Sequence, residues 1–243
     1  MIKKKHIILF IVVGLLAVFL FFLKKYWEAS AEDISYTYHC GWVDWKHART
    51  GTTQAFVDDF SKQFENTALN DTFKIKYRQE GGMKSKGINW CIYRVEKEYA
   101  IVKFSNTETA KKQLLFQVFK EICFLFENYQ KEVFYGALQS SAFKEGDMMG
   151  NLIGFYISCG DMTKEEAIAL CGEVPVAVSE QLKMEGKLGI NASFKPIYHF
   201  EQEEKPAFPL AFQKYQKLEN ANAYIRPLHM KRTITFFGKA WER

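Results

Sequence analysis

The stretch of this chain with the most chemically capable side chains is His39-Cys40-Gly-Trp-Val-Asp44-Trp-Lys-His47. Asp44 and His47 are three positions apart, so on a helix they would share a face, which suits a common metal ion or a histidine oriented by a carboxylate. Cys40 could act as a nucleophile with His39 or His47 as its base if its pKa is lowered. The spacings of zinc fingers and of HExxH proteases are absent. A structural interpretation, with Cys40 in a disulfide and Asp44 as a helix cap, is favoured over a catalytic one.

Glu127 is the other candidate, because it directly follows the apolar run Ile-Cys-Phe-Leu-Phe. A buried carboxylate must be paired, protonated or bound to metal, which would make Glu127 a partner of His47. Asp44, His47 and Glu127 are therefore the candidate metal ligands, and together with Cys40 they are the candidate catalytic residues. The alternative, with Glu127 on a solvated edge, is preferred. No pattern identifies a cofactor.

The elements that must position these side chains are indicated by apolar periodicity. Phe56, Phe60 and Phe64 recur at intervals of four and predict one apolar stripe on a helix. Two β-type runs follow, and Glu96-Lys97-Glu98 is expected to be the turn of a hairpin within the second run. Residues 81–87, with three glycines and two lysines, are expected to form an exposed, mobile loop.

A long helix is predicted next, because Ser105 to Glu108 reads Ser-Asn-Thr-Glu, a capping box. The helix should run to about Phe134. Its buried stripe is formed by Leu115, Val118, Phe119, Ile122, Phe126 and Tyr129.

Shorter helices are expected beyond residue 140. Ser141 can cap a helix on which Asp147 and Asn151 share a face, interpreted as a first-turn acid and a surface amide. Thr163 and Glu166 form a further capping box.

The C-terminal part is expected to be strand and loop, because residues 191–212 contain three prolines. Residues 232–238 predict a final strand. The expected fold class is α+β, a helix-rich domain with a small antiparallel sheet, preceded by one N-terminal transmembrane helix.

The transmembrane prediction concerns Ile7 to Leu23, a run of 17 uncharged and almost wholly apolar residues. As a helix it would rise about 25 Å, at the short end for spanning a bilayer. Lysines flank both ends, and Tyr26 and Trp27 follow at the level of an interfacial aromatic belt. Because the lysines before the run outnumber those after it, the N-terminus is expected in the cytoplasm and the domain in the periplasm of a bacterial inner membrane.

A cleaved signal peptide is the alternative, since Ala29-Ser30-Ala31 matches the small-residue cleavage pattern. The length and flanks of the apolar run favour an uncleaved anchor. The expected organisation is an anchor at 1–25, a linker at 26–35 and one extracytoplasmic domain at 36–243.

The charge distribution argues against a nucleic-acid partner. The first 25 residues hold five lysines and no acid, whereas the remainder carries 28 basic and 28 acidic residues. The net charge of +5 thus comes from the anchor, and the domain has no basic footprint for phosphates. The only partner predicted is the lipid bilayer, through residues 7–23.

The chain has five cysteines, all after the apolar run. An oxidising compartment permits disulfides, and the odd number leaves at least one thiol unpaired in a monomer. Cys159 and Cys171 are the preferred pair because they are close in sequence. Cys123, inside an apolar helix, is the preferred free thiol.

Three blocks of the chain together resemble a bacterial envelope family known only as a domain of unknown function. Its blocks run roughly CGxxDxxHxR, EIxxWHExxTWYG and SSFSxEDLxSNLLG, and the resemblance covers about residues 39–157. The matching residues are Cys40, Gly41, Asp44, His47, Arg49, Glu121, Ile122, Glu127, Gly136, Ser141, Phe143, Asp147, Asn151 and Gly154.

The resemblance implies an envelope protein in which a His-Glu pair on the second block meets the Asp and His of the first, as a metal or acid–base site. Here Phe126 stands in place of that histidine, and Phe has no lone pair for a metal. Gly146 replaces an acidic residue of the third block. The expected role is therefore binding or structural, with an envelope hydrolase using Asp44, His47 and Glu127 as the alternative.

Overall fold

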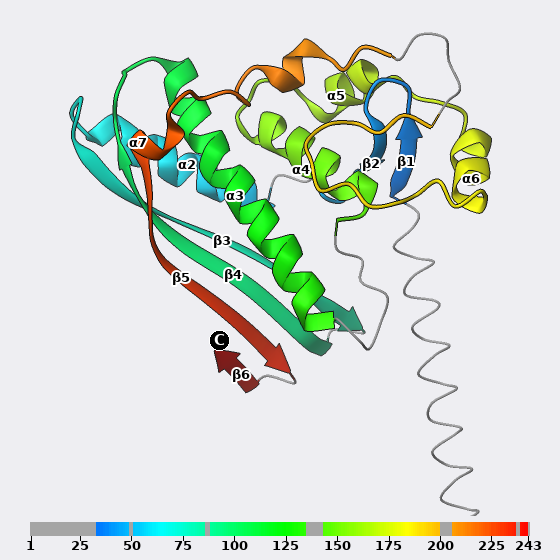
Figure 1. The fold of residues 1–243 in the computed structure, drawn as a ribbon, viewed down its shortest axis with the longest axis horizontal. Helices are drawn as coiled ribbons and strands as arrows, with labels where there is room; N and C mark the ends of the chain where they lie inside the picture. The colour runs from blue at the N-terminus through cyan, green and yellow to red at the C-terminus, as the bar shows by residue number, and fades with distance from the viewer. Residues whose placement is uncertain are drawn as a thin grey trace, which may run out of the picture.

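The computed structural model describes residues 33–48, 51–85, 88–134, 143–199, 206–236 and 239–242, and these form an α+β structure (Figure 1). The α+β class is thus confirmed, although the strands form two antiparallel sheets instead of the single small sheet expected. The apolar run 7–23 lies outside the described residues. Within the part described, no helix combines the length and apolarity needed to cross a membrane.

The first two strands along the chain form one sheet and the remaining four form the other. The strands are β1 (Ile34–Thr37), β2 (Gly41–Asp44), β3 (Thr72–Ser85), β4 (Ile88–Val102), β5 (Ile225–Phe236) and β6 (Lys239–Glu242). The helices are α2 (Gly51–Asn66), α3 (Glu108–Phe134), α4 (Glu145–Ser158), α5 (Lys164–Cys171), α6 (Val176–Met184), the 3-10 turn η1 (Leu210–Gln213) and α7 (Ala221–Tyr224).

The two sheets lie at different ends of the structure. Strands β3, β4, β5 and β6 pair in that order, with the long helix α3 lying across them (Figure 1). Strands β1 and β2 form a separate hairpin, which is surrounded by α4, α5 and α6. The larger sheet and α3 thus form one half of the molecule, and the hairpin with its three helices forms the other.

One face of the larger sheet is buried against helices. On β3, Phe73, Ile75 and Tyr77 are buried, and they alternate with exposed lysine and arginine side chains. The Tyr77 ring stacks on Phe56 of α2, with 4.1 Å between centroids. It also lies against Phe119 of α3. Both helices therefore cover the same face, as expected for an antiparallel sheet with one solvated side.

The turn expected at Glu96 to Glu98 is wrong, because β4 runs straight through it. Glu96 pairs with Lys76 on β3 at 2.8 Å, whereas the next residue, Lys97, lies on the opposite face of the strand, where it pairs with Glu121 of α3. The run of charges is therefore paired across the two faces of a strand here and does not mark a chain reversal. The loop expected at 81–87 is also wrong in part, since Gly81 to Ser85 continue β3 in pairing with β4.

Helix α3 begins at Glu108, so the capping prediction was displaced by two residues. Thr107 provides the cap, since its hydroxyl accepts a hydrogen bond from the Ala110 amide at 3.3 Å. The end at Phe134 is confirmed. The predicted stripe is confirmed as well, because Leu115, Val118, Phe119, Ile122, Phe126 and Tyr129 are all buried.

The capping box of Thr163 and Glu166 is confirmed in both of its hydrogen bonds. Helix α4, in contrast, begins at Glu145 after Lys144, while Ser141, the expected cap, lies outside the described residues.

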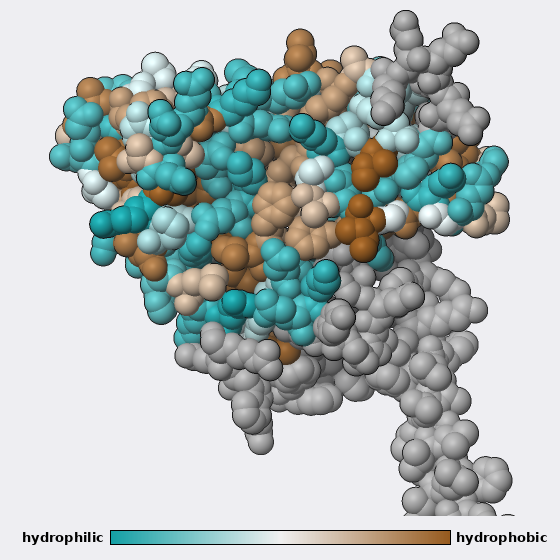
Figure 2. All heavy atoms as spheres, viewed as in Figure 1, coloured by the Kyte–Doolittle hydropathy of each residue, from teal (hydrophilic) through white to brown (hydrophobic). Residues whose placement is uncertain are grey.

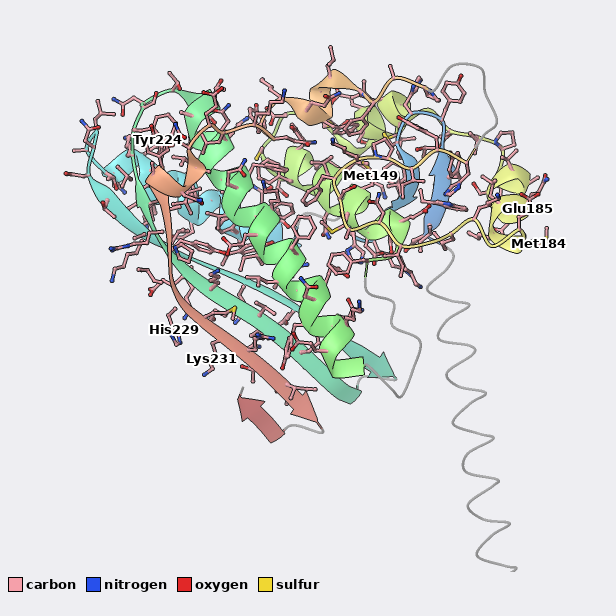
Figure 3. The ribbon with its side chains drawn as sticks, in the orientation of Figure 1. Met149, Met184, Glu185, Tyr224, His229 and Lys231 are labelled. Carbon is pink, nitrogen blue, oxygen red and sulfur yellow. A yellow bond between two sulfur atoms is a disulfide. The ribbon has the colours of Figure 1, made fainter. Side chains whose placement is uncertain are left out.

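The visible surface is mostly hydrophilic, with small separated hydrophobic patches (Figure 2). In the side-chain view, Met149 is a buried residue of α4, whereas Met184 and Glu185 lie at the end of α6 (Figure 3). Tyr224, His229 and Lys231 mark the course of α7 and β5 in the same view.

Candidate metal centre

Asp44 and His47 are brought together by a tight turn and not by a helix. Asp44 is the last residue of β2, and its carbonyl accepts the His47 amide at 3.1 Å. Its carboxylate oxygen Oδ1 also accepts the Lys46 amide at 2.8 Å. An aspartate that bonds the backbone two residues ahead stabilises such a turn. The two side chains therefore leave the end of the hairpin on the same side.

Three glycines of α4 allow this turn to lie directly on the helix. Gly146, Gly150 and Gly154 are four residues apart and face the segment from Val43 to Ala48. A Cβ atom on Gly150 would lie 2.2 Å from the carbonyl oxygen of Asp44. Since no side chain could fit there, glycine is required for the close approach of the two backbones.

Asp147 of α4 completes the arrangement. Nε2 of His47 lies 3.9 Å from Oδ2 of Asp44 and 3.9 Å from Oδ1 of Asp147. One donor atom from each of these three residues lies within 4.8 Å of the others. The sequence prediction had assigned Asp147 an ordinary role in the first turn of a helix. The spacing Gly146-x-x-x-Gly150-x-x-x-Gly154 was the signal that could have found it, since it marks the helix face against which another backbone packs.

Glu127 of α3 is fully buried, so its preferred placement on a solvated edge was wrong. Its charge acts on the pKa of His47, but it is not among the three residues whose donor atoms lie within 4.8 Å of one another. Oε2 accepts the Phe143 amide at 2.8 Å. Oε1 is buried and has no hydrogen-bond partner among the described residues. We refer to Asp44, His47, Glu127 and Asp147 as the His47 cluster.

The three carboxylates of the His47 cluster are held in the same way. Each uses one oxygen to accept a backbone amide: Lys46 for Asp44, Phe143 for Glu127 and, at 3.2 Å, Lys144 for Asp147. The second oxygen of each is left for another partner, and in both aspartates it faces His47. This is the geometry of carboxylates prepared to bind an ion through one oxygen each.

The pKa values of Asp147, Glu127 and His47 are shifted by burial and by the neighbouring charges. Burial raises the pKa of Asp147 to about 7, with Glu127 and Asp44 adding to the rise and the opposing effects of His47 and Lys144 only partly offsetting it. Burial also raises the pKa of Glu127, with Asp44 contributing. Burial alone would lower the pKa of His47, but Asp147, Asp44 and Glu127 outweigh it and raise the pKa, assisted by Asn151.

These charges favour a divalent cation. If all three carboxyls are ionised and His47 is protonated, the cluster carries two negative charges in a poorly solvated place, which is costly without a compensating ion. The donor atoms lie within 4.8 Å of one another, so the side chains would move slightly closer around an ion with zinc–ligand bonds of about 2.0–2.2 Å. An imidazole with carboxylates suits zinc, manganese or ferrous iron, whereas magnesium and calcium prefer oxygen donors alone.

Solvent reaches the cluster on the histidine side. The His47 side chain is 30% exposed, compared with 10% for Asp44 and 7% for Asp147. An ion bound here would therefore keep a coordination position for water or for another ligand on that side.

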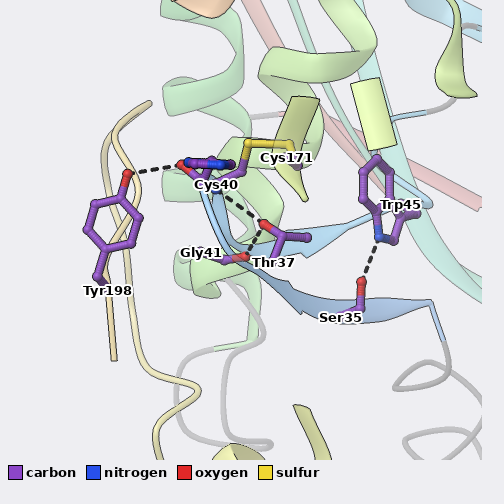
Figure 4. The surroundings of a disulfide bond; sticks show 8 residues. Ser35, Thr37, Cys40, Gly41, Trp45, Cys171 and Tyr198 are labelled. Carbon is purple, nitrogen blue, oxygen red and sulfur yellow. Dashed lines mark hydrogen bonds between the residues drawn. A yellow bond between two sulfur atoms is a disulfide. The ribbon is translucent and has the colours of Figure 1, made fainter. Parts of the chain in front are cut away.

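The remaining predicted site residue, Cys40, is bonded to Cys171 (Figure 4). Its sulfur cannot serve as a thiolate nucleophile while that bond is intact. The preferred pairing of Cys159 with Cys171 is thus wrong. It was chosen because the two cysteines are close in sequence, whereas the actual partner, Cys40, is 131 residues from Cys171. Cys123 is free and buried, as predicted.

No protein-family model, no curated protein and no solved structure matches this chain. The resemblance of residues 39–157 to the envelope family stays a prediction, and the geometry of the His47 cluster carries the functional argument.

Proposed function

We propose that this protein is a membrane-anchored, metal-binding protein of the bacterial envelope. Its domain binds one divalent transition-metal ion through Asp44, His47 and Asp147, with Glu127 as a further buried donor. The observation that carries this proposal is that Asp44 and Asp147 each place one carboxylate oxygen 3.9 Å from Nε2 of His47, while a backbone amide holds the other oxygen of each. A binding role is preferred to a catalytic one because the candidate nucleophile, Cys40, is in a disulfide.

The proposed location has two supports. Residues 7–23 have the length, apolarity and flanking lysines of a bilayer anchor with its N-terminus in the cytoplasm. The Cys40–Cys171 disulfide suits an oxidising compartment, such as the periplasm, beyond that anchor. Protease treatment of spheroplasts would test this, since digestion of the domain only after the inner membrane is broken would contradict it.

Metal binding is tested on the full chain purified in detergent and freed of metal by a chelator. Titration with Mn²⁺ and Zn²⁺ in a calorimeter, together with elemental analysis, should give one ion per chain. His47→Ala should weaken binding at least tenfold, and so should Asp147→Asn, which preserves the shape of the side chain. Unchanged metal content in both variants would refute the site.

His199→Ala is the matched control. His199 is also a largely buried histidine beside a carboxylate, since its Nε2 lies 2.7 Å from Oε2 of Glu145. It does not belong to the three-residue group of metal donors. This variant should keep the metal affinity of the unmodified chain, so that a general loss of fold can be separated from loss of a ligand.

A second candidate function is a metal-dependent envelope hydrolase using Asp44, His47 and Glu127. The observation that favours it is the partly exposed His47 side chain, which would leave a bound ion open to water or substrate. A metal ion lowers the pKa of a bound water and so supplies a nucleophile near neutral pH. Turnover of chromogenic ester and phosphoester probes by the Mn²⁺-loaded chain would support this function if Asp147→Asn abolished it. Absence of turnover would favour the binding role over the catalytic one.

A further inference from the structure

The β1–β2 hairpin is joined to the following helices at both ends of β2. Cys40, just before β2, is bonded to Cys171 at the end of α5. Asp44, the last residue of β2, lies on α4 beside Asp147. The four residues of β2 are all buried and span only about 13 Å, so movement at one end of the strand is transmitted to the other.

The contacts around the disulfide fix the hairpin turn onto the end of α5. The amides of Tyr38 and His39 donate to the carbonyls of Gly172 and Cys171, at 2.8 and 2.7 Å. Inside the turn, the Thr37 hydroxyl donates to the Gly41 carbonyl (Figure 4). The two bonds to Gly172 and Cys171 depend on the hairpin turn lying beside the end of α5, and the disulfide keeps these two segments together.

We propose that the Cys40–Cys171 disulfide is a positioning element of the metal centre, so that metal affinity depends on the oxidation state of this bond. The inference rests on the proposed metal-binding function. With the disulfide intact, Asp44 and His47 are held against α4 before the ion arrives, and binding does not have to order them. With the bond reduced, the turn gains freedom, and part of the binding free energy is used to restore the arrangement.

The coupling must be reciprocal. If the disulfide strengthens metal binding by a given factor, bound metal shifts the reduction equilibrium of the disulfide by the same factor. Reduction by glutathione consumes two glutathione thiols, which are oxidised to glutathione disulfide, and leaves Cys40 and Cys171 as two thiols. The metal-loaded protein should therefore need a more reducing ratio of the two glutathione forms.

Mn²⁺ is the suitable probe, because it prefers carboxylate and imidazole donors and competes little for thiols. Calorimetric titration of the full chain, oxidised and reduced, should show Mn²⁺ affinity about tenfold weaker in the reduced protein, within the usual range of coupled sites. Circular dichroism and thermal melting check that the reduced chain is folded. A Cys40→Ser/Cys171→Ser variant should reproduce the weaker affinity without any reductant.

The reciprocal measurement uses mixtures of the two forms of glutathione with and without saturating Mn²⁺, read by alkylation and mass spectrometry of the peptides carrying Cys40 and Cys171. The oxidised fraction should rise with Mn²⁺ in the unmodified chain and stay constant in His47→Ala. Equal Mn²⁺ affinity in the two redox states would overturn the proposal. Global unfolding on reduction would overturn it too, since the bond would then hold the whole fold. Failure of the oxidised chain to bind Mn²⁺ would refute the metal-binding function itself.

Discussion

The first turn of α4 takes part in two carboxylate–histidine arrangements, which differ in the number of acids and in the distance between the groups. Glu145 and His199 are in direct contact, with 2.7 Å between Oε2 and Nε2. In the His47 cluster, Nε2 of His47 lies 3.9 Å from the nearest oxygen of Asp44 and equally far from that of Asp147. One acid and one histidine satisfy each other, whereas three acids around one histidine leave a gap and an excess of negative charge.

The difference indicates which of the two arrangements would bind a ligand. The Glu145–His199 pair closes the contact between α4 and the segment ending at residue 199, and the Glu145 amide also donates to the Gly189 carbonyl. The acid and the histidine of this pair satisfy each other without a ligand. In the His47 cluster, backbone amides hold the carboxylates, but no carboxylate oxygen of Asp44 or Asp147 is within hydrogen-bond distance of the His47 ring. The arrangement is therefore stable only if protons or a cation neutralise the carboxylates.

The largest effect is expected where the backbone of α4 is in direct contact with the turn after β2. Gly150→Ala would place its Cβ 2.2 Å from the Asp44 carbonyl oxygen, and both backbones would have to move. We expect a loss of about 3 kcal/mol in the free energy of unfolding, together with loss of Mn²⁺ binding. Chemical denaturation and calorimetry measure the two effects.

Gly189→Ala provides the comparison beside the Glu145–His199 pair. Its Cβ would lie 3.2 Å from Oε1 of Glu145, the movable end of a side chain. A change of about 1 kcal/mol or less is expected, with metal binding retained. Equal losses in the two variants would show that the close approach at Gly150 has no special importance.

The metal-free protein should become less stable as the pH rises from about 4 to 7. The pKa of Asp147 is about 7 in the folded protein and 3.8 in the unfolded chain, so over this range the unfolded chain releases a proton that the folded protein keeps. The raised pKa of His47 acts in the same direction, because its contribution to stability is lost as the pH rises through the folded value. The loss is on the order of 3 kcal/mol.

Urea denaturation at pH 5 and pH 7.5, in the presence of a chelator, tests this prediction. Asp147→Asn should remove most of the pH dependence, whereas Glu145→Gln should retain it. Saturating Mn²⁺ should reverse the trend in the unmodified chain, since the ion binds the deprotonated carboxylates. A metal-free protein equally stable at both pH values would contradict the raised pKa of Asp147.

Glu127→Gln separates charge from shape within the His47 cluster. The amide oxygen of glutamine can still accept the Phe143 amide, while the negative charge is lost. Mn²⁺ affinity should fall about tenfold, which corresponds to about 1.4 kcal/mol. The stability of the metal-free chain at pH 7.5 should not fall. A variant that is destabilised without metal but binds Mn²⁺ normally would assign Glu127 a purely structural role.

The smallest effect is expected at the Glu145–His199 pair. His199→Ala removes one hydrogen bond between largely buried groups, and a destabilisation of about 1 kcal/mol should follow. Its Mn²⁺ affinity should stay within about twofold of the unmodified chain. Loss of metal binding in this variant would mean that the two arrangements are not independent.

Local patterns in the sequence predicted the helices well, because each depends on neighbours within a few residues. The stripe from Leu115 to Tyr129 and the capping box of Thr163 and Glu166 are examples. The charged run at Glu96 to Glu98 misled, because the same composition occurs in turns and within strands. Cross-strand pairing, which no local pattern contains, decided that case.

For the candidate site, the sequence alone determined the residue types and the proximity of Asp44 to His47. Asp44 and His47 are near each other along the chain, so their proximity was foreseeable, although a turn and not a helix provides it. Only the tertiary structure could decide that Asp147 and the buried Glu127 join them and that Cys40 is bonded to Cys171. These partners lie about 80 to 130 residues away along the chain. Asp147 reaches Asp44 and His47 because Gly146, Gly150 and Gly154 let the backbones of α4 and of the turn after β2 approach at a distance that no side chain would allow.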